Sequence, residues 1–503
     1  MNEDIFDILE FDKVLDHLSQ LPVSPLGEKK IRRIHPLTSP DLIQHDLNLV
    51  TELREILDFD DPFPISGLQD ITEALAQLKI EGRFLNAEEL SRIAGTLEVA
   101  RKMKAYFADR QEKYPHLTEI VRHVHSFSDE ESEINRCIDK SSFMVFDKAS
   151  ANLNRIRRSI VTQEEQIRKK LESMVTNFAA KGYLQENVIA MRNNRLVLMV
   201  KDAYKGKVRG LIHDQSATGA TVFVEPLEML EMNNRIRALR IDEKREIEKI
   251  LSTLSELIRA KLPEIQTTLD SLGQLDFIFA KAQLSRTMKA ASPAVNNENR
   301  LEIINGKHPL LVLRYDDQRE VVPLNLRMGE EFRTLVISGP NAGGKTVALK
   351  TVGLLCLMTA CGLHIPAEAG SDMPVFHQIF AVIGDQQSLE NDLSTFSSHV
   401  ASLKKVIDEA DRESLVLVDE IGAGTDPEEG AALAIAVLES LTKRGCLTLV
   451  STHQGALKVF AHDTPEVENG SMEFDRETLQ PTYRFRVGIP GSSYAYEIAN
   501  RLG

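Results

Sequence analysis

The segment from residue 333 to residue 358 constrains the fold of this chain more than any other part. It reads RTLVIS, then the glycine-rich GPNAGGKT, then the apolar run VALKTVGLLCLM. This order predicts a buried strand, a tight turn and an apolar helix, and the turn matches the pattern GxxxxGK[ST] in that context. A strand and a helix joined by such a loop are typical of an α/β domain with a parallel sheet.

The glycine-rich loop predicts a site for ATP and Mg²⁺. Its glycines let backbone N–H groups curve around a phosphate, and the following helix adds positive potential at its N-terminus. We expect Lys345 to contact the β- and γ-phosphates and the Thr346 hydroxyl to bind Mg²⁺. The predicted phosphate-binding residues are Gly339, Pro340, Asn341, Ala342, Gly343, Gly344, Lys345 and Thr346.

Two acidic residues follow a second apolar run downstream of this loop. Residues 415–418 read LVLV and predict a buried parallel strand, with Asp419 and Glu420 directly after it. We expect Asp419 to hold Mg²⁺ and Glu420 to polarise the attacking water as a general base. A core strand that ends in an acidic turn is common by itself, but the glycine-rich loop upstream favours the catalytic interpretation.

A histidine follows a third apolar strand, CLTLVST at residues 446–452. A polar residue directly after a core strand of such a sheet points to the crevice where ligands bind. We therefore expect His453 to sense or stabilise the γ-phosphate, with a purely structural role as the alternative. Together with Lys345 and Glu420, it completes the predicted catalytic set.

The chain before residue 301 predicts a mostly helical protein with one β-rich insert. Two long apolar stripes near heptad spacing predict an antiparallel coiled-coil lever, and the segment between them alternates like short strands. The polar segment 292–300 reads as a linker. The predicted parts are a first helical core at 1–145, lever helices at 146–262 with a clamp tip at about 185–226, a core return and linker at 263–300, and an α/β ATPase domain at 301–503.

Positive charge concentrates in one region of an acidic chain. The net charge is −15, yet residues 151–215 contain 13 Lys or Arg against 6 Asp or Glu, a local charge of +7, so the remainder carries −22. Such asymmetry predicts an anion-facing surface with nucleic acid as its partner. The alternative is that these residues only keep an exposed hairpin soluble. The predicted contacts are Arg192, Arg195, Lys201, Lys205, Lys207 and Arg209.

Composition predicts a cytoplasmic protein that does not span a membrane. The content of 42% apolar and 27% charged residues is that of a globular protein in water, and no apolar run approaches the ~18 residues of a transmembrane helix. The acidic N-terminus is unlike a secretory signal. The four cysteines show no paired spacing, so we expect reduced thiols and no metal site there.

Four segments in fixed order resemble the MutS family of ATPases: GPNAGGKT, DLSTFSSH, LVLVDEIGAGTDP and STHQ. From its residues alone, the second segment predicts a helix N-cap at Ser394 and Thr395. The resemblance implies more, namely an ABC-type ATPase domain in which this serine contacts the nucleotide of the other subunit. It therefore implies a homodimer in which Ser394 and Thr395 act in trans.

The helical start LEFDKVLDHL and the segment HDQSATGATVFVEP resemble the MutS-two branch of bacteria. Members of that branch usually continue into KOW-like and Smr nuclease domains, so we expect a truncated chain with no nuclease activity in these 503 residues. The resemblance implies an ATP-driven clamp that splits stalled ribosomes, or that binds branched DNA and suppresses homologous recombination. An ATP-switched mismatch-repair protein is the alternative, although no N-terminal mismatch reader fits this sequence. The long arm and the STF motif disfavour a transporter ATPase.

Overall fold

The computed structural model describes residues 4–192, 195–315, 319–340, 343–384, 392–475 and 480–491, with the backbone alone at 392–396. The chain forms two compact units that interleave along the sequence. The first comprises Met1–Leu68, Lys102–Val124 and Thr268–Gly503, and the second comprises Gln69–Arg101 and His125–Thr267. The domain boundaries expected at residues 145, 262 and 300 stay predictions. Among the described residues, no helix combines the length and the apolar character needed to cross a membrane.

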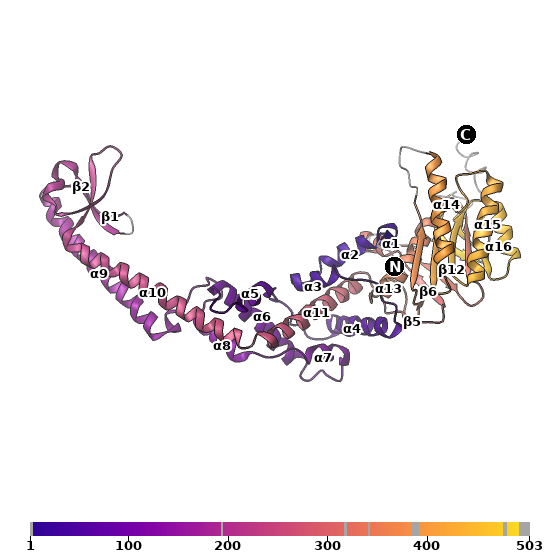
Figure 1. The fold of residues 1–503 in the computed structure, drawn as a ribbon, viewed down its shortest axis with the longest axis horizontal. Helices are drawn as coiled ribbons and strands as arrows, with labels where there is room; N and C mark the ends of the chain where they lie inside the picture. The colour runs from indigo at the N-terminus through magenta and orange to yellow at the C-terminus, as the bar shows by residue number, and fades with distance from the viewer. Residues whose placement is uncertain are drawn as a thin grey trace. The chain divides into compact units, whose positions relative to one another are not determined.

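Helices form the N-terminal part of the first unit (Figure 1). They are α1 (Asp4–Ile8), α2 (Phe11–Ser19), α3 (Pro25–Ile31), α4 (Pro40–Phe59) and α7 (Pro115–Val121). Glu10, whose φ is 60°, interrupts the helical chain between α1 and α2. Lys13 and Lys350 pair with Glu10 and lower its pKa to about 2, so ion pairs stabilise the interruption.

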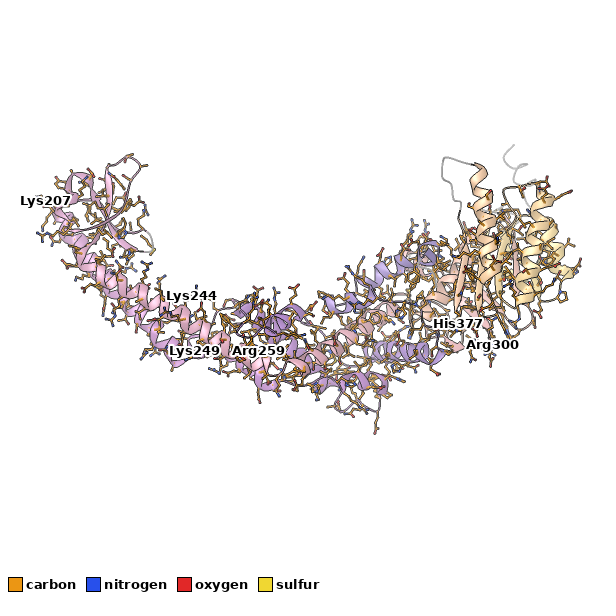
Figure 2. All side chains as sticks on the ribbon, in the orientation of Figure 1. Lys207, Lys244, Lys249, Arg259, Arg300 and His377 are labelled. Atoms are coloured by element: carbon orange, nitrogen blue, oxygen red, sulfur yellow. The ribbon has the colours of Figure 1, made fainter. Side chains whose placement is uncertain are left out.

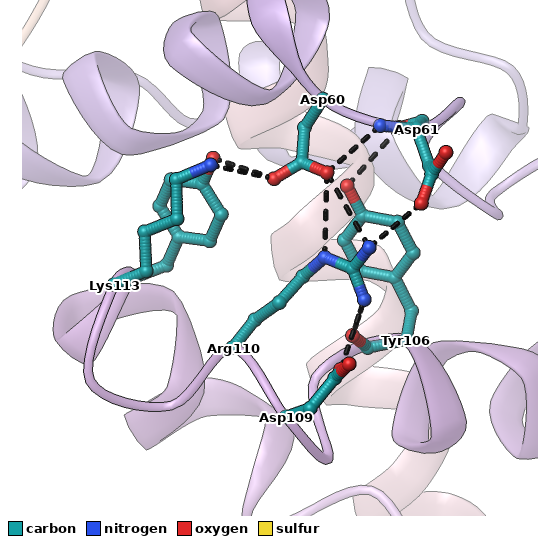
Figure 3. A network of polar contacts seen from close by, with 7 residues as sticks. Asp60, Asp61, Tyr106, Asp109, Arg110 and Lys113 are labelled. Atoms are coloured by element: carbon teal, nitrogen blue, oxygen red, sulfur yellow. Dashed lines mark hydrogen bonds and ion pairs between the residues drawn. The ribbon is translucent and has the colours of Figure 1, made fainter.

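A polar network closes the C-terminal end of α4 (Figure 3). Asp60, the residue after the helix, accepts hydrogen bonds from Lys113 Nζ and from the Tyr114 hydroxyl, both at 2.9 Å. Arg110 Nη2 donates to the neighbouring Asp61 at 2.7 Å. Lys113 is the main cause that holds the pKa of Asp60 well below its usual range. The network joins two stretches of chain that lie about 50 residues apart in sequence.

A six-stranded sheet forms the centre of the first unit. Its strand order is β10-β11-β12-β8-β13-β14, in which the first five strands run parallel and β14 is antiparallel. This confirms the parallel sheet predicted from the glycine-rich segment. The strands are β8 (Thr334–Ser338), β10 (Gln378–Val382), β11 (Ser414–Val418), β12 (Leu447–Thr452), β13 (Val467–Asp475) and β14 (Gln480–Val487).

Alternate residues of these strands face two different helical layers. Leu335 and Ile337 of β8 pack in one apolar core with α13 (Lys345–Ala360) and with Leu9 from the N-terminal helices. Val336, which lies between them, packs in a second core with α14, α15 and α16. These helices span Asp392–Glu409, Pro427–Arg444 and Gly455–Asp463. The period-two alternation of the strands thus produces a helix–sheet–helix arrangement.

A second sheet of the first unit has four strands in the order β5-β9-β6-β7. They are β5 (Ala294–Asn296), β6 (Leu301–Gly306), β7 (Leu324–Met328) and β9 (Asp372–Pro374), and α12 (Pro309–Tyr315) follows β6. The prediction of a plain linker at 292–300 is therefore wrong, because β5 lies within it and pairs in parallel with β9. Asn296 Nδ2 donates to Asp372 Oδ1 at 2.7 Å, so its polar side chain contributes to this pairing.

The second unit consists of helices and one sheet. Its helices are α5 (Thr72–Leu78), α8 (Ser128–Cys137), α9 (Ala151–Ala180) and α10 (Leu227–Arg259), with short 3₁₀ turns at Asp147–Ala149 and Asp202–Lys207. Residues of α6 (Ala87–Tyr106) and α11 (Leu262–Thr287) are divided between the units. Reciprocal hydrogen bonds cap the start of α6. Asn86 Oδ1 accepts from Glu89 N, and Glu89 Oε2 accepts from Asn86 N, both at 2.9 Å.

Helices α9 and α10 run antiparallel and side by side (Figure 1). The ion pairs between them show the antiparallel direction, because residues with higher numbers in α9 pair with residues with lower numbers in α10. The ion pairs are Arg157–Glu243 at 2.7 Å, Glu164–Arg240 at 2.8 Å and Lys170–Glu228 at 3.3 Å. Five apolar positions of the predicted stripe are buried: Leu153, Ile156, Ile160, Ile167 and Leu171. The coiled-coil character of this pair stays a prediction.

The tip is a four-stranded antiparallel sheet in the order β1-β2-β4-β3. Its strands are β1 (Leu184–Arg192), β2 (Arg195–Lys201), β3 (Gly210–Gln215) and β4 (Thr221–Pro226). This confirms strands in the segment where the alternation predicts them. Every residue of β4 is buried, and Val222 and Val224 pack with Ile167 and Leu171 of α9 in one core.

Candidate functional site

The glycine-rich loop lies between the end of β8 and the start of α13. Gly339 has a φ of 138° and Gly344 a φ of 93°, which L side chains rarely adopt, so glycine is required at both positions. Gly343 N donates to Pro340 O at 3.0 Å and closes the turn. Two other residues of the predicted loop, Asn341 and Ala342, lie outside the described residues.

Lys345 is the first residue of α13 and lies almost completely buried, with 2% of its surface exposed. Its ammonium group donates to Gly339 O at 2.6 Å and contacts His453 Nε2 at 3.0 Å. Burial is the main cause that lowers its pKa to about 8, although Glu420 and Asp419 oppose this change. A buried ammonium group at the start of a helix that follows a glycine-rich loop is the arrangement that binds nucleotide phosphates. The residue therefore fits the phosphate of a nucleotide.

The contact between Lys345 and His453 defines the protonation of the histidine. Lysine has only donors, so His453 Nε2 must act as the acceptor and the ring is neutral. Burial, and then the charge of Lys345, lower the pKa of His453, in agreement with a neutral ring. The nearest carboxylate oxygen of Glu420 is 3.8 Å from the same nitrogen. The structure thus brings together the three residues of the predicted catalytic set.

Two predicted ligands of Mg²⁺ meet where β11 ends and α13 begins. The Thr346 hydroxyl donates to Asp419 Oδ2 at 2.6 Å. Both groups offer oxygen ligands, which Mg²⁺ prefers, and Mg²⁺ usually takes only one or two carboxylates or hydroxyls from the protein. This pair of side chains fits that ion.

Ser451 is a residue of the site that the sequence interpretation missed. It lies buried at the end of β12, and its hydroxyl donates to Asp419 Oδ1. Ser451 Oγ also accepts a hydrogen bond from Glu420 N at 2.8 Å, so one serine orients both acids. Ser451, in the strand segment LTLVST, was the available signal, because a buried hydroxyl requires a partner.

Glu420 is held in an unusual backbone conformation. Its φ of 51° lies in the left-handed region, which costs a non-glycine residue about 1 kcal/mol or more. Hydrogen bonds on both sides keep it there, from Asp419 N to Val382 O at 2.9 Å and from Ile421 N to Ser451 O at 3.0 Å. This turn directs the carboxylate of Glu420 toward His453. Both residues line a cavity of about 580 Å³.

The STF segment is only partly described. Helix α14 begins at Asp392, so Ser394 and Thr395 lie in its first turn, and the predicted N-cap at Ser394 is wrong. The side chains of both residues lie outside the described part of the chain. Their action in trans therefore stays a prediction.

The six basic residues of the tip differ in how much of their charge is already compensated. Arg195 donates to both oxygens of the buried Glu225, at 2.8 and 2.7 Å, and also to Asn234 at 2.9 Å. Its guanidinium holds the sheet together, which the sequence interpretation missed. Arg192 lies over the ring of Phe223, 4.1 Å from its centroid.

The remaining four predicted contacts lie around the 3₁₀ turn at Asp202–Lys207. Lys201 Nζ donates to Gly182 O at 3.2 Å, and Lys205 pairs with Asp202 at 2.9 Å. Lys207 and Arg209 are exposed, and Lys207 lies at the outer end of the tip (Figure 2). These four form the accessible basic surface of the tip, whereas Arg195 does not belong to it.

Glu225 organises the interior of the tip sheet. It is fully buried and accepts hydrogen bonds from Arg195, from His213 Nε2 at 2.5 Å and from Asn233 Nδ2 at 2.6 Å. Burial alone would raise the pKa of its carboxyl, but the three hydrogen bonds outweigh burial and lower the pKa. A buried carboxylate with this many donors is a structural anchor rather than a reactive group.

Comparison with known proteins relates the whole chain to one group. Residues 335–503 match the family model described as MutS domain V. Endonuclease MutS2 of Alkaliphilus oremlandii is 42% identical over 505 residues, which cover 100% of this chain and 63% of the relative. Proteins of the same description from Geobacillus sp. (strain WCH70) and Pelotomaculum thermopropionicum are 41% and 44% identical, covering 64% and 62% of their lengths. The chain thus spans slightly less than two thirds of these relatives, and the expectation about nuclease activity stays a prediction.

Proposed function

We propose that the chain is a MutS-family protein of the branch that the MutS2 relatives represent, and that it is a Mg²⁺-dependent ATPase acting on nucleic acid. One observation carries the ATPase part of the proposal. Lys345, Asp419 and His453 follow three neighbouring parallel strands, and their side chains meet with those of Thr346 and Glu420 at one edge of the sheet. Ligands of open parallel sheets bind at this edge.

Each residue of the site has a distinct role in the proposed hydrolysis. Lys345 holds the β- and γ-phosphates, and the neighbouring loop amides orient them. Glu420 accepts a hydrogen bond from the attacking water and aligns it with the γ-phosphorus. The neutral His453 accepts from Lys345 at Nε2, which keeps Lys345 in place, and can donate to a γ-phosphate oxygen from Nδ1. When bound by Thr346 and Asp419, Mg²⁺ would neutralise charge on the phosphate oxygens.

Replacement of Lys345 by methionine tests this assignment. Methionine fills the buried volume but removes the cation, so we expect kcat/KM for ATP to fall about 10²–10³-fold. The measurement is release of phosphate together with equilibrium binding of a fluorescent ATP analogue. Lys443→Met, at an exposed lysine of α15, is the matched control and should hydrolyse ATP like the wild type. Unchanged hydrolysis by Lys345→Met would refute the site.

We propose that a second copy of the chain completes each site. The cavity beside Glu420 and His453 is open and lined by Gly422 and Thr452 as well, so it has room for residues of a partner. Ser394 and Thr395 of the second copy are the proposed contacts to the γ-phosphate. This part of the proposal rests on the family resemblance of the STF segment.

We propose that the accessible basic surface of the tip binds phosphates of a nucleic-acid assembly, either a stalled ribosome or branched DNA. Attraction of lysines to phosphates does not depend on sequence, so both targets suit it. The triple replacement of Lys201, Lys205 and Lys207 by alanine should weaken binding and reduce the slope of log K against log salt by roughly 2–3. Binding is measured with ribosomes, a four-way junction and linear duplex between 50 and 200 mM salt. An unchanged slope for all three would contradict the tip as the contact surface.

The triple variant needs a control with equal loss of charge elsewhere in the second unit. Lys244, Arg245 and Lys249 are exposed on α10 and offer such a set (Lys244 and Lys249 are labelled in Figure 2). Their replacement by alanine should leave the salt slope close to that of the wild type. An equal reduction by both triple variants would mean that overall charge, and not the tip, determines binding.

A further inference from the structure

Three aromatic rings stack at the end of the tip where α9 meets the sheet. The rings of Phe178 and Tyr183 have centroids 6.3 Å apart and planes inclined by 29°. The rings of Tyr183 and Tyr204 are closer, at 5.0 Å and 27°. Phe178 belongs to the last turn of α9, Tyr183 to the following loop and Tyr204 to the 3₁₀ turn after β2. The three rings therefore form one continuous stack from three separate elements.

The backbone fixes the elements that carry this stack. Tyr183 N donates to Phe178 O at 3.1 Å, and Tyr183 O accepts from Lys201 N at 3.0 Å. Asp202 N donates to Ala220 O at 3.0 Å and anchors the 3₁₀ turn. Main-chain hydrogen bonds thus anchor the start of the 3₁₀ turn that carries Tyr204.

The stack ends at the surface. Phe178 and Tyr183 are partly buried, but Tyr204 is 38% exposed. Because Tyr183 covers one face of the Tyr204 ring, only the opposite face is left for another ring to stack against. A flat partner that covers this face removes apolar surface from water, which favours stacking.

Several cationic residues lie close to Tyr204 along the chain. Lys205 and Lys207 lie in the same 3₁₀ turn, and Lys201 immediately precedes it. Lys181 Nζ lies 6.0 Å from the centroid of Phe178, at the base of the stack. Asp202 is the acidic residue of the turn, and it already pairs with Lys205. An exposed aromatic face amid lysines is the arrangement by which proteins bind single-stranded nucleic acid.

We propose that Tyr204 stacks against an unpaired nucleobase while Lys201, Lys205 and Lys207 hold the adjoining phosphates. This inference rests on the proposed function, since it assumes that the tip binds nucleic acid. It adds a substrate class: strands with unpaired nucleotides are preferred over continuous duplex, whose bases are already stacked on their neighbours. Every base offers a flat face, so the preference concerns structure and not sequence.

The test compares a single strand with a duplex that carries the same total number of phosphates. The full chain is titrated into a single strand and into a matched duplex, each with 2-aminopurine at the centre, whose fluorescence falls when it stacks on an aromatic ring. Tyr204→Leu keeps an apolar side chain but removes the ring, so its affinity for the single strand should fall roughly tenfold, with the quenching lost. Its affinity for the duplex should stay unchanged.

Two further variants separate stacking from folding. Tyr204→Phe keeps the ring and should retain both the quenching and the affinity for the single strand. Leu211→Ala, at an exposed apolar residue of β3, should bind like the wild type. Equal affinities of Tyr204→Leu and wild type for the single strand would overturn the stacking site and leave the proposed function intact. An equal loss of affinity of Tyr204→Leu for the single strand and for the duplex would also overturn the stacking site. No binding of either strand by the wild type would overturn both.

Discussion

Replacement of Glu420 by glutamine is expected to lower kcat for ATP hydrolysis by about 10²–10⁴-fold while ATP affinity stays within a few-fold of the wild type. Glutamine has nearly the same shape, so the left-handed backbone at this residue and its hydrogen bonds can remain. What is lost is the negative charge that orients and polarises the attacking water. Lys345, Thr346 and Asp419 are untouched, so ATP and Mg²⁺ should still bind. Single-turnover hydrolysis and equilibrium binding measure the two effects separately.

The same variant tests the proposed dimer, because ATP that is bound but not hydrolysed should hold two copies together. Sedimentation of Glu420→Gln with ATP and Mg²⁺ should give a larger mass than without ATP. Glu439→Gln, which removes an exposed carboxylate paired with Lys443 on α15, should behave like the wild type in both measurements. A parallel loss of ATP affinity and kcat in Glu420→Gln would assign this residue a structural role instead.

Replacement of Asp276 by alanine is expected to destabilise the first unit by about 3–4 kcal/mol. Asp276 lies fully buried in α11 and accepts hydrogen bonds from four donors at the start of α3. These are Val23 N at 2.9 Å, Ser24 N at 3.0 Å, Ser24 Oγ at 2.6 Å and Gly27 N at 3.3 Å. Alanine leaves these donors buried without an acceptor, and each then costs desolvation energy.

Urea-induced unfolding, followed by circular dichroism, measures this loss. Asp270→Ala is the matched control, because Asp270 is exposed on the same helix and its removal should change the stability by less than about 0.5 kcal/mol. Equal midpoints for Asp276→Ala and wild type would show that water replaces the carboxylate. The close approach of Gly27, where an added Cβ would lie 2.7 Å from Asp276 Oδ2, leaves little room for such a water.

The core of the nucleotide site could be predicted because short, continuous stretches of sequence mark its residues. Asp419 and His453 each follow directly on an apolar strand, and Lys345 follows a third strand after the glycine-rich loop. Parallel strands place their carboxyl ends at one edge of a sheet. Ser451 escaped prediction because its partners, Asp419 and Glu420, lie some 30 residues away and no periodic pattern marks the contact.

Two of the errors share a physical cause, namely partners that are distant in sequence. Arg195 was assigned to phosphate binding by its charge, but the acid that binds it lies 30 residues later within an apolar strand. The acid in TVFVEP was the overlooked signal, because a buried carboxylate requires a cation or several donors. Likewise β5 was taken for a linker, since its three residues show no pattern and its partner strand is far along the chain.

The shared core of the N-terminal helices and the sheet has a consequence for synthesis of the protein. Leu9 packs where a side chain at Gly353 would clash with it, and the two residues are separated by about 340 positions. At translation rates of 5–20 residues per second, Leu9 emerges roughly 17–70 s before this partner exists. During that interval the apolar faces of the first helices remain uncovered, so the nascent chain depends on chaperones or on slow compaction until the nucleotide-binding half has been made.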